Sequence, residues 1–416
     1  MTTFVVVGAA LAGAKAVETL RAEGFDGRLV LVGDETERPY ERPPLSKGYL
    51  QGKDPRDSAY VHEAVWYGEH DVELLLGVRA TDLDPEAHTL TLDGFEKLTY
   101  DKLLLTTGAR PRTVDVPGVD LHGVRYLRTL TDSDNLLNRF SGSASPVVII
   151  GGGWIGLEVA AAARARGAEV TVVEMDQLPL RRVLGDEVAS IYADLHRSQG
   201  VTFRFGTGLE AFEGTGGDLE AVRLTDGTVL PAAVAVVGVG ARPNVELAQA
   251  AGLAVDNGVV TDPALRTSHP DVYAAGDVAS TLNPLLGRHV RVEHWGNALA
   301  GGPAAARAML GQDVVYDWVP YFYSDQYDLG MEYAGYVEPG AYDQVVFRGD
   351  PTVKPGDAPE FIAFWVKEGR VLAGMNANVW DVQDDIQKLV RAGYTGTPVD
   401  LAKLADPETP LNELVP

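Results

Sequence analysis

Cysteine does not occur among the 416 residues of this chain. Its absence excludes disulfides, thiolate-ligated zinc, cysteine-ligated iron–sulfur clusters and cysteine nucleophiles within these residues, and no metal site is predicted. A chain without cysteine is typical of a reducing compartment, so we expect a cytoplasmic protein.

Positive charge and long apolar runs are also scarce. The chain has 35 Lys and Arg residues against 59 Asp and Glu residues, which gives a formal net charge of −24. Such a surface repels phosphate backbones and anionic lipids, so we expect neither nucleic acid nor a membrane as a partner. No apolar run approaches the roughly 18 residues that a membrane span needs. The length fits about two to three domains.

Two stretches repeat the order strand, glycine-rich turn, alanine-rich helix. Residues 5–13 read VVVGAALAG, and residues 147–156 read VVIIGGGWIG. The second stretch has the complete dinucleotide-binding spacing at Gly151, Gly153 and Gly156, whereas the first has Gly8 and Gly13 with Ala10 between them. In this pattern the first glycine makes a tight turn, the second position admits a pyrophosphate, and the third lets the helix pack on the strand. The alternative for each copy is a turn whose glycines serve packing alone.

The repeat continues downstream of both turns. The second strands, RLVLVGDE and EVTVVEMD, end in the acidic residues Asp34, Glu35 and Glu174, which can accept hydrogen bonds from ribose hydroxyls. Residues 93–111 and 226–243 then share an Asp-Gly turn, a strand and a Gly-Ala-Arg-Pro exit. Two matching copies therefore predict two dinucleotide-binding domains of the same design.

Two further segments have features of a flavin site. The strand DVYAAG ends at Gly276, and Asp277 follows at the carboxyl end of the strand, where ligands of open α/β sheets bind. Its carboxylate can accept hydrogen bonds from the hydroxyls of a polyol; the alternative is that Asp277 is the N-cap of a helix. The segment RPYERPPLSK is stiffened by prolines, and a helix is predicted to begin at its Leu45. The segment offers a wall for a flat ring with Lys47 over it, or else a loop with a solvated lysine.

The ordered motifs GAALAG, RPPLSK, TTGARPR, GGGWIGLEVAA, TSHPDVYAAGD and VEHWGNA resemble the FAD-dependent NADH:ferredoxin reductases of bacterial oxygenase systems, over roughly residues 4–340. The resemblance implies FAD on the first copy and NADH on the second. The residues implied at FAD are Gly8, Ala10, Leu11, Ala12, Gly13, Asp34, Glu35, Arg42, Pro44, Lys47, Ala80, Thr107, Gly108, Arg110, Arg128, Gly276, Asp277 and Trp295. Those implied at NADH are Gly151, Gly152, Gly153, Ile155, Gly156, Glu174, Arg182 and Gly240.

The implied reaction is hydride transfer from NADH to FAD, followed by single-electron transfer to a 2Fe–2S ferredoxin that serves a haem monooxygenase or a Rieske dioxygenase. The implied catalytic residues are Lys47, Glu158 and Trp295, with Glu158 facing Lys47 near the flavin. Trp295 read alone is equally well a core aromatic. Because disulfide and sulfenate relays need thiols, this chain should pass electrons from the flavin directly.

Cofactor choice and partner contact give two further expectations. A carboxylate at Glu174 favours NADH over NADPH, although Arg181 and Arg182 could weaken that preference. An acidic ferredoxin would be repelled by the net charge, so we expect a local basic patch from Arg288, Arg291 or Arg307, unless these arginines only pair with neighbouring acids. Two alternatives remain open: a reductase of quinones or radicals such as monodehydroascorbate, and a flavin redox switch like the apoptosis-inducing factor.

The predicted fold is α/β, with two Rossmann-like domains and a C-terminal α+β domain. Residues 1–111 and 244–320 are predicted to bind FAD, residues 112–243 to bind NAD, and residues 321–416 to form an antiparallel sheet with one or two helices. Trp365 and Trp380 are expected in the core of that last domain, and we expect a monomer or weak homodimer.

Overall fold

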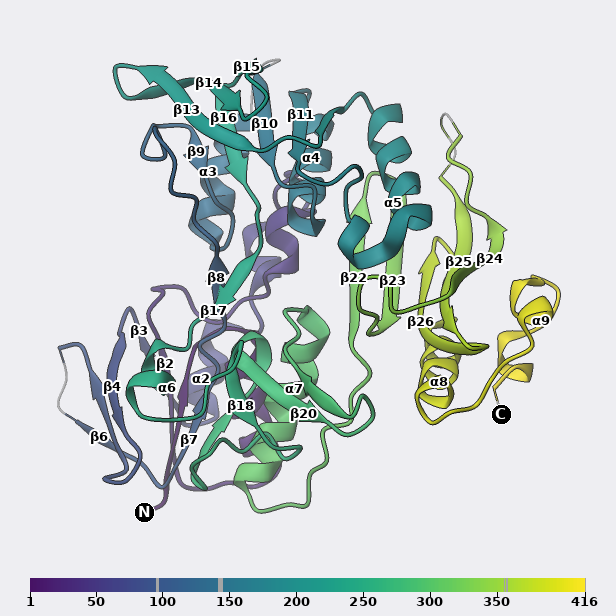
Figure 1. Ribbon diagram of the computed structural model, residues 1–416. Helices are drawn as coiled ribbons and strands as arrows, with labels where there is room; N and C mark the ends of the chain where they lie inside the picture. The colour runs from purple at the N-terminus through teal and green to yellow at the C-terminus, as the bar shows by residue number, and fades with distance from the viewer. Residues whose placement is uncertain (95–96, 141–144, 355, 357, 416) are drawn as a thin grey trace. The chain divides into compact units, whose positions relative to one another are not determined.

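The computed structural model describes residues 1–94, 97–140, 145–354, 356 and 358–415 (Figure 1). The chain divides into two compact units. Unit 1 consists of Met1–Glu41, Arg56–Arg110 and Ala241–Pro320, and unit 2 of Arg42–Pro55, Pro111–Gly240 and Tyr321–Pro416. The proline-rich segment is thus divided, with its part up to Glu41 in unit 1 and its part from Arg42 in unit 2. The three predicted domains remain a prediction, with boundaries close to the points where the chain passes between the units.

Unit 1 is built on a five-stranded parallel sheet in the order β19-β7-β1-β2-β3. Its strands are β1 (Thr3–Val7), β2 (Arg28–Gly33), β3 (Val72–Leu76), β7 (Lys102–Leu105) and β19 (Val272–Ala274). The central strands are continuous Val and Leu runs because a parallel sheet is covered on both faces. Helices α1 (Leu11–Ala22) and α7 (Trp295–Met309) pack against each other, and a Cβ at Gly302 would overlap the carbonyl oxygen of Ala12.

The remaining elements of unit 1 are two small sheets and short helices. One sheet contains β4 (Ala80–Asp84), β5 (Thr89–Leu92) and β6 (Leu98–Thr99), and the other β18 (Val259–Thr261), β20 (Ala279–Asn283) and β21 (Arg288–Val290). The short elements are η2 (Arg56–Ala59), α2 (Ala64–Glu69), α6 (Glu246–Ala250) and η3 (Gly276–Val278), with β8 (Ala109–Pro111) and β17 (Ala241–Pro243) where the chain leaves and re-enters the unit.

Unit 2 contains a second five-stranded parallel sheet, in the order β12-β11-β10-β16-β9. Its strands are β9 (Val124–Arg125), β10 (Pro146–Ile150), β11 (Glu169–Glu174), β12 (Thr202–Phe205) and β16 (Val234–Val237). Helices α3 (Leu130–Phe140), α4 (Trp154–Ala165) and α5 (Arg181–Ser198) accompany it, as does a small sheet of β13 (Leu209–Thr215), β14 (Asp218–Leu224) and β15 (Val229–Pro231).

The two parallel sheets have the same topology. The strand before the glycine turn is central in each sheet: β1 lies between β2 and β7, and β10 lies between β11 and β16. One neighbour, β2 or β11, follows the helix after the turn. The other neighbour, β7 or β16, comes later in the chain and precedes a Gly-Ala-Arg-Pro exit. Each unit also carries a three-stranded antiparallel sheet inserted before that later strand. The internal repeat predicted from the sequence is therefore confirmed.

The C-terminal part of unit 2 is a five-stranded antiparallel sheet in the order β22-β23-β26-β25-β24 (Figure 1). Its strands are β22 (Tyr321–Gln326), β23 (Leu329–Gly335), β24 (Gln344–Asp350), β25 (Glu360–Lys367) and β26 (Arg370–Ala377), followed by α8 (Gln383–Tyr394), α9 (Leu401–Ala405) and η4 (Leu411–Glu413). Trp365 is fully buried as expected. The expectation for Trp380 was wrong: it is 54% exposed, because it follows the end of β26.

Within the described ranges, none of the helices is both long and apolar enough to cross a bilayer.

Candidate functional site

The first glycine turn, in unit 1, has the conformation that a phosphate loop needs. Gly8 has φ of +123°, and a Cβ there would overlap the carbonyl oxygen of Thr106. A Cβ at Gly13 would overlap the carbonyl oxygen of Gly8. Gly8 therefore requires glycine because of its positive φ as well as the overlap, and Gly13 because of the overlap alone. Ala10 lies at the N-cap of α1 with φ of −113°, a conformation open to any residue. The middle position therefore tolerates alanine without backbone strain.

The second turn, in unit 2, has the same geometry. Gly151 has φ of +104°, and a Cβ at Gly156 would overlap the carbonyl oxygen of Gly151. Gly153 lies at the N-cap of α4 with φ of −78°, and among the described residues no atom lies within 4 Å of a Cβ built there. The space in front of Gly153 is therefore open.

Both helices that follow these turns begin without a capping side chain. In the part of the chain that the structure describes, no side chain bonds to the first N–H groups of α1 or α4, and neither first turn contains an acidic residue. Free N–H groups and the positive end of the helix dipole favour a bound anion. The two turns therefore fit the pyrophosphate of a dinucleotide.

Acidic residues lie at the carboxyl end of the second strand of each parallel sheet, with Glu174 the last residue of β11 and Asp34 and Glu35 directly after β2. In unit 1, Asp34 accepts from Arg79 at 3.1 Å, and Glu35 accepts from the Tyr40 hydroxyl. In unit 2, Glu174 accepts from the backbone N–H of Gly152 at 2.7 Å and from that of Asp176 at 2.9 Å. These two bonds hold the Glu174 carboxylate beside the glycine turn.

The two arginines after Glu174 are both paired with acids. The Nε of Arg182 donates to Asp176 at 2.6 Å, and this hydrogen bond is the main reason that the pKa of Arg182 is raised. Arg181 donates to Asp186 in the same way. The sequence pointed to both arginines, but it did not single out the acids that neutralise them.

Apolar side chains are exposed at the carboxyl edge of the unit 2 sheet. Met175 is 71% exposed directly after β11, and Val239 is 40% exposed just after β16. Ile155, in the first turn of α4, is 46% exposed. Apolar side chains at this edge suit the flat faces of a dinucleotide. Sequence reasoning identified Ile155 and missed Met175 and Val239, although Met175 directly follows Glu174 and Val239 directly precedes Gly240.

The other predicted FAD residues of unit 1 lie in loops and at element ends. Thr107 donates to the carbonyl oxygen of Asn244 at 2.8 Å, Arg110 donates to the side chain of Asn244 at 2.6 Å, and Trp295, the first residue of α7, donates to Glu41 at 2.9 Å. Asp277 lies inside η3, whose N-cap is Ala275, so the alternative that Asp277 is a helix N-cap is wrong. The remaining residues of this set are Leu11 and Ala12 in α1, Ala80 at the start of β4, Gly108 with φ of +67° and Gly276 with φ of +74°.

The second half of the proline-rich segment, in unit 2, forms a 3-10 turn, η1 (Pro43–Ser46), and hydrogen-bonded turns follow it. The expected helix beginning at Leu45 is absent from this described segment, because Lys47, the residue after η1, has φ of −116° and ψ of −122°, which lies outside the helical region. Arg42, at the N-cap of η1, donates to the carbonyl oxygen of Arg128, which ties this turn to the start of α3. Elsewhere in unit 2, Gly240 has φ of +105°.

Lys47 and Glu158 form a buried ion pair in unit 2. The Nζ of Lys47 lies 2.8 Å from Oε2 of Glu158, with the two side chains 12% and 3% exposed. The predicted contact between them is confirmed; Glu158 lies on the second turn of α4, not the first. Two hydroxyls that sequence reasoning missed complete the site: Ser46 donates to Oε2, and Ser324 donates to Oε1 at 2.7 Å. The Lys47 ammonium also lies 5.3 Å from the centroid of the Tyr323 ring.

The structure does not support the expected basic patch in unit 1. Arg291 pairs with Glu293, and its side chain is only 9% exposed. Arg307 pairs with Glu23 at 3.0 Å. Two of the three arginines are therefore neutralised by neighbouring acids.

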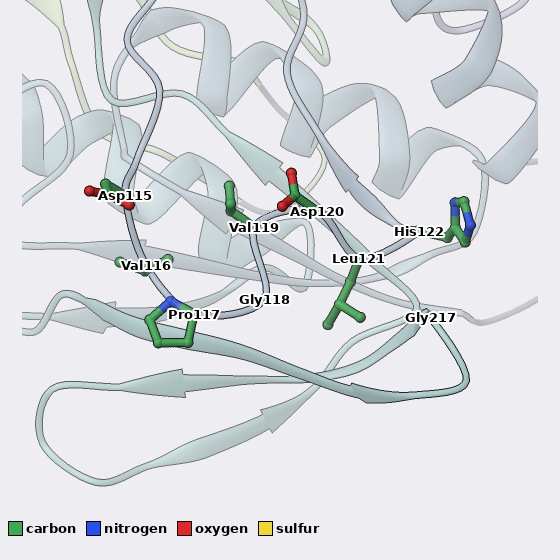
Figure 2. Close-up of a pocket in the computed structure, with 9 residues that line it drawn as sticks. All are labelled: Asp115, Val116, Pro117, Gly118, Val119, Asp120, Leu121, His122 and Gly217. Atoms are coloured by element: carbon green, nitrogen blue, oxygen red, sulfur yellow. The ribbon is translucent and has the colours of Figure 1, made fainter.

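A cavity of about 640 Å³ lies in unit 2, and its lining contains no residue of the glycine turn (Figure 2). Figure 2 shows the segment from Asp115 to His122 curving around it, with Gly217 from the turn between β13 and β14 beside His122. The lining is formed by short apolar side chains, two carboxylates and one imidazole. It includes none of the residues predicted to bind a cofactor.

Comparisons with known proteins agree with this geometry. Residues 2–302 match the pyridine nucleotide-disulphide oxidoreductase family, and residues 321–415 match the reductase C-terminal family. The chain is 40% identical to the ferredoxin–NAD(+) reductase component of the anthranilate 1,2-dioxygenase system of Burkholderia cepacia, covering 96% of each chain. It is 37% identical to putidaredoxin reductase of Pseudomonas putida, covering 99% of this chain and 96% of that one.

Solved structures of ferredoxin reductases are also similar to this chain. The covalent complex of putidaredoxin reductase with putidaredoxin contains a chain that matches with a TM-score of 0.92 at 36% identity, covering 100% of this chain and 98% of that one. A ferredoxin reductase from Rhodopseudomonas palustris also matches with a TM-score of 0.92, at 34% identity and with both chains fully covered. The chain therefore belongs to the pyridine nucleotide-disulphide oxidoreductase family, among the ferredoxin–NAD reductases of oxygenase systems.

Proposed function

We propose that this protein is an FAD-dependent NADH:ferredoxin reductase of an oxygenase system. The observation that carries the proposal is the pair of matching glycine turns, each leading into a helix without a side-chain cap, in a chain that has no cysteine. The relatives named above are ferredoxin–NAD reductases, which supports the same activity. Bound FAD supplies the chemistry, because it accepts a hydride from NADH and releases electrons one at a time.

We assign the binding of FAD to the first turn and its neighbours, and the binding of NADH to the second. In unit 1, Gly8 and Gly13 permit the tight turn, and the short side chain of Ala10 leaves room for the FAD pyrophosphate at the α1 N-terminus. In unit 2, Gly151, Gly153 and Gly156 do the same for NADH at α4. The other residues assigned to the two cofactors are those predicted from the sequence.

Lys47 is assigned the role of the cation that stabilises negative charge on the reduced ring. Its ammonium is held by the Glu158 carboxylate and is largely withdrawn from water. In a site with little water, a fixed charge acts more strongly than it does in solution. Glu158 therefore serves to keep Lys47 charged and in place, and Trp295 remains a candidate wall for the ring.

We further propose that the acceptor is a 2Fe–2S ferredoxin serving a haem monooxygenase or a Rieske dioxygenase. The names of the relatives and the putidaredoxin complex support a ferredoxin partner. The absence of cysteine supports direct transfer from the flavin, since a thiol relay has no residues here. A cytoplasmic location, and a monomer or weak homodimer, remain part of the proposal.

The experiment that tests this function is a visible spectrum of the purified protein followed by anaerobic titration with NADH. We expect a flavin spectrum that bleaches with one equivalent of NADH, and rapid reduction of an added 2Fe–2S ferredoxin. Faster turnover with small quinones than with every ferredoxin tested would instead favour a quinone reductase. A protein that does not bind FAD would overturn the proposal.

Replacing Asp176 with alanine is expected to raise kcat/KM for NADPH about tenfold. The substitution keeps the backbone N–H that bonds to Glu174 but frees Arg182, which can then bond to a 2′-phosphate. A hydrogen bond to a charged group contributes about 1.5–3 kcal/mol, which corresponds to tenfold or more. The matched control is Asp186→Ala, which frees Arg181. If Asp176→Ala has no effect on NADPH, or if Asp186→Ala has the same effect, Arg182 does not lie at the phosphate.

Replacing Ala10 with valine is expected to weaken FAD binding, whereas Ala10→Gly should be tolerated. Ala10 is the N-cap of α1, beside the site assigned to the pyrophosphate, and its backbone conformation suits either substitution. Only the larger side chain should therefore matter. The measurement is the FAD dissociation constant of each variant by fluorescence quenching. Full flavin occupancy in Ala10→Val would contradict close approach at this position.

A further inference from the structure

A chain of buried hydrogen bonds leads away from Glu158 through unit 2. Ser324 donates to Oε1 of Glu158 at 2.7 Å, and the Nε2 of Gln326 donates to the Ser324 hydroxyl at 3.1 Å. The Oε1 of Gln326 lies 2.7 Å from Nε2 of His196, and the Tyr327 hydroxyl lies 3.2 Å from Nδ1 of His196. Gln326 and His196 are fully buried, and Ser324 is 1% exposed.

The chain arises from three elements of unit 2. Ser324 and Gln326 are two residues apart on β22, so both side chains lie on the same face of the C-terminal sheet. Glu158 comes from α4 and His196 from the last turn of α5. The C-terminal sheet therefore contacts the Glu158 carboxylate through polar side chains, while Phe322 of β22 and Leu157 of α4 belong to one apolar cluster.

Chemistry allows only one direction for these bonds. An ionised carboxylate only accepts, so the single hydroxyl proton of Ser324 goes to Glu158. Gln326 must then donate to Ser324 through its NH₂ group and accept from His196 through its carbonyl oxygen. His196 must carry its proton on Nε2, which leaves Nδ1 to accept from Tyr327. Each assignment is forced by the one before it.

The protonation states of the two end groups agree with this direction. Burial lowers the pKa of His196 to about 4, so the ring is neutral near pH 7 and has one donor and one acceptor. Burial also raises the pKa of the Tyr327 hydroxyl, which keeps its proton. The amide of Gln326 does not relay protons readily. The chain is therefore a fixed series of dipoles whose positive ends all point toward Glu158.

We propose that Ser324, Gln326 and His196 are positioning residues that hold the Glu158 carboxylate in the orientation in which it fixes Lys47. This inference rests on the proposed function, because it assumes that Lys47 acts on the reduced flavin. Ser46 and Lys47 hold one oxygen of Glu158, and the chain from the C-terminal sheet holds the other. Without the chain, the carboxylate can rotate and Lys47 loses its fixed position.

The test compares holoprotein variants by stopped-flow reduction of the flavin with NADH. We expect Ser324→Ala to slow the limiting rate roughly tenfold with little change in the NADH concentration at half-saturation, since one hydrogen bond to a charged group is lost. Gln326→Leu should slow it less, and Ser324→Thr, which keeps the hydroxyl, should recover most of the rate. The matched control is Ser198→Ala, because the Ser198 hydroxyl donates to the Leu195 carbonyl of its own helix.

A second readout reports the direction of the chain itself. Nitrogen NMR of histidine-labelled protein should show His196 as the neutral Nε2–H tautomer between pH 6 and 8, and Gln326→Leu should disturb that signal. A wild type that NADH does not reduce would refute the proposed function. A wild type that is reduced normally, with Ser324→Ala equal to it in rate or slowed only in proportion to lost FAD, would overturn this inference alone. Assignment of His196 as the Nδ1–H tautomer would also overturn it.

Discussion

Replacing Glu158 with alanine is expected to lower the free energy of unfolding by about 3–5 kcal/mol, which is the usual effect of removing one partner of a buried ion pair. The loss is large because Lys47 would keep its charge in a site where its side chain is only 12% exposed. The hydroxyls of Ser46 and Ser324 would also lose their acceptor. The measurement is thermal unfolding of the holoprotein, followed by circular dichroism and by flavin fluorescence.

The control for this prediction is the double variant Lys47→Met with Glu158→Leu. It removes both charges and replaces them with apolar side chains of similar length, so it should unfold at a higher temperature than Glu158→Ala. Its rate of flavin reduction should nevertheless fall by about 10²–10³, because a positioned charge is gone. A double variant less stable than Glu158→Ala would show that an unpaired charge is not the cause.

Replacing Gly156 with alanine is expected to abolish NADH binding, and with it flavin reduction, while leaving FAD bound. The added Cβ would overlap the carbonyl oxygen of Gly151, which is backbone and cannot move aside as a flexible side chain could. The turn would have to open, and the helix N-terminus would no longer face the phosphates. The measurement is the anaerobic NADH titration, with the bound FAD counted from the visible spectrum.

Gly153→Ala is the matched control, since it adds the same methyl group three residues earlier. Gly153 has negative φ, and among the described residues no atom lies within 4 Å of the added Cβ. It also reproduces in the second turn the alanine that the first turn carries naturally at position 10. We expect Gly153→Ala to fold normally and to weaken NADH binding by only a few-fold. Equal loss in both variants would contradict the distinction between the two glycine positions.

Local patterns were enough to predict much of the fold. The two glycine turns, the acids after the second strands and the Gly-Ala-Arg-Pro exits all lie within short segments, and strand order follows from the repeat once one copy is understood. The antiparallel C-terminal sheet could be predicted because its strands alternate with turn residues. Ala10 illustrates the same point, since its negative φ follows from its place at the helix N-cap.

The partners of the charged residues could not be predicted in the same way. Glu158 is bonded by Ser46 and Ser324, which lie 112 and 166 residues away, and no local pattern relates them. The sequence indicated Arg307 as a contact for a ferredoxin, but Arg307 pairs with Glu23, which belongs to a distant segment of the sequence within the same unit. Trp380 was placed in the core on hydrophobicity alone, whereas its exposure depends on where β26 ends.

The order of the strands along the chain has a consequence for synthesis on the ribosome. In unit 1, β7 pairs with β19, and β19 begins at Val272, long after β7 ends at Leu105. At a synthesis rate of about 5–20 residues per second, β7 remains without its neighbour β19 for roughly 8 to 34 s. In unit 2, every strand of the parallel sheet lies between Val124 and Val237. The second dinucleotide fold along the chain is therefore the first that can complete its sheet during translation.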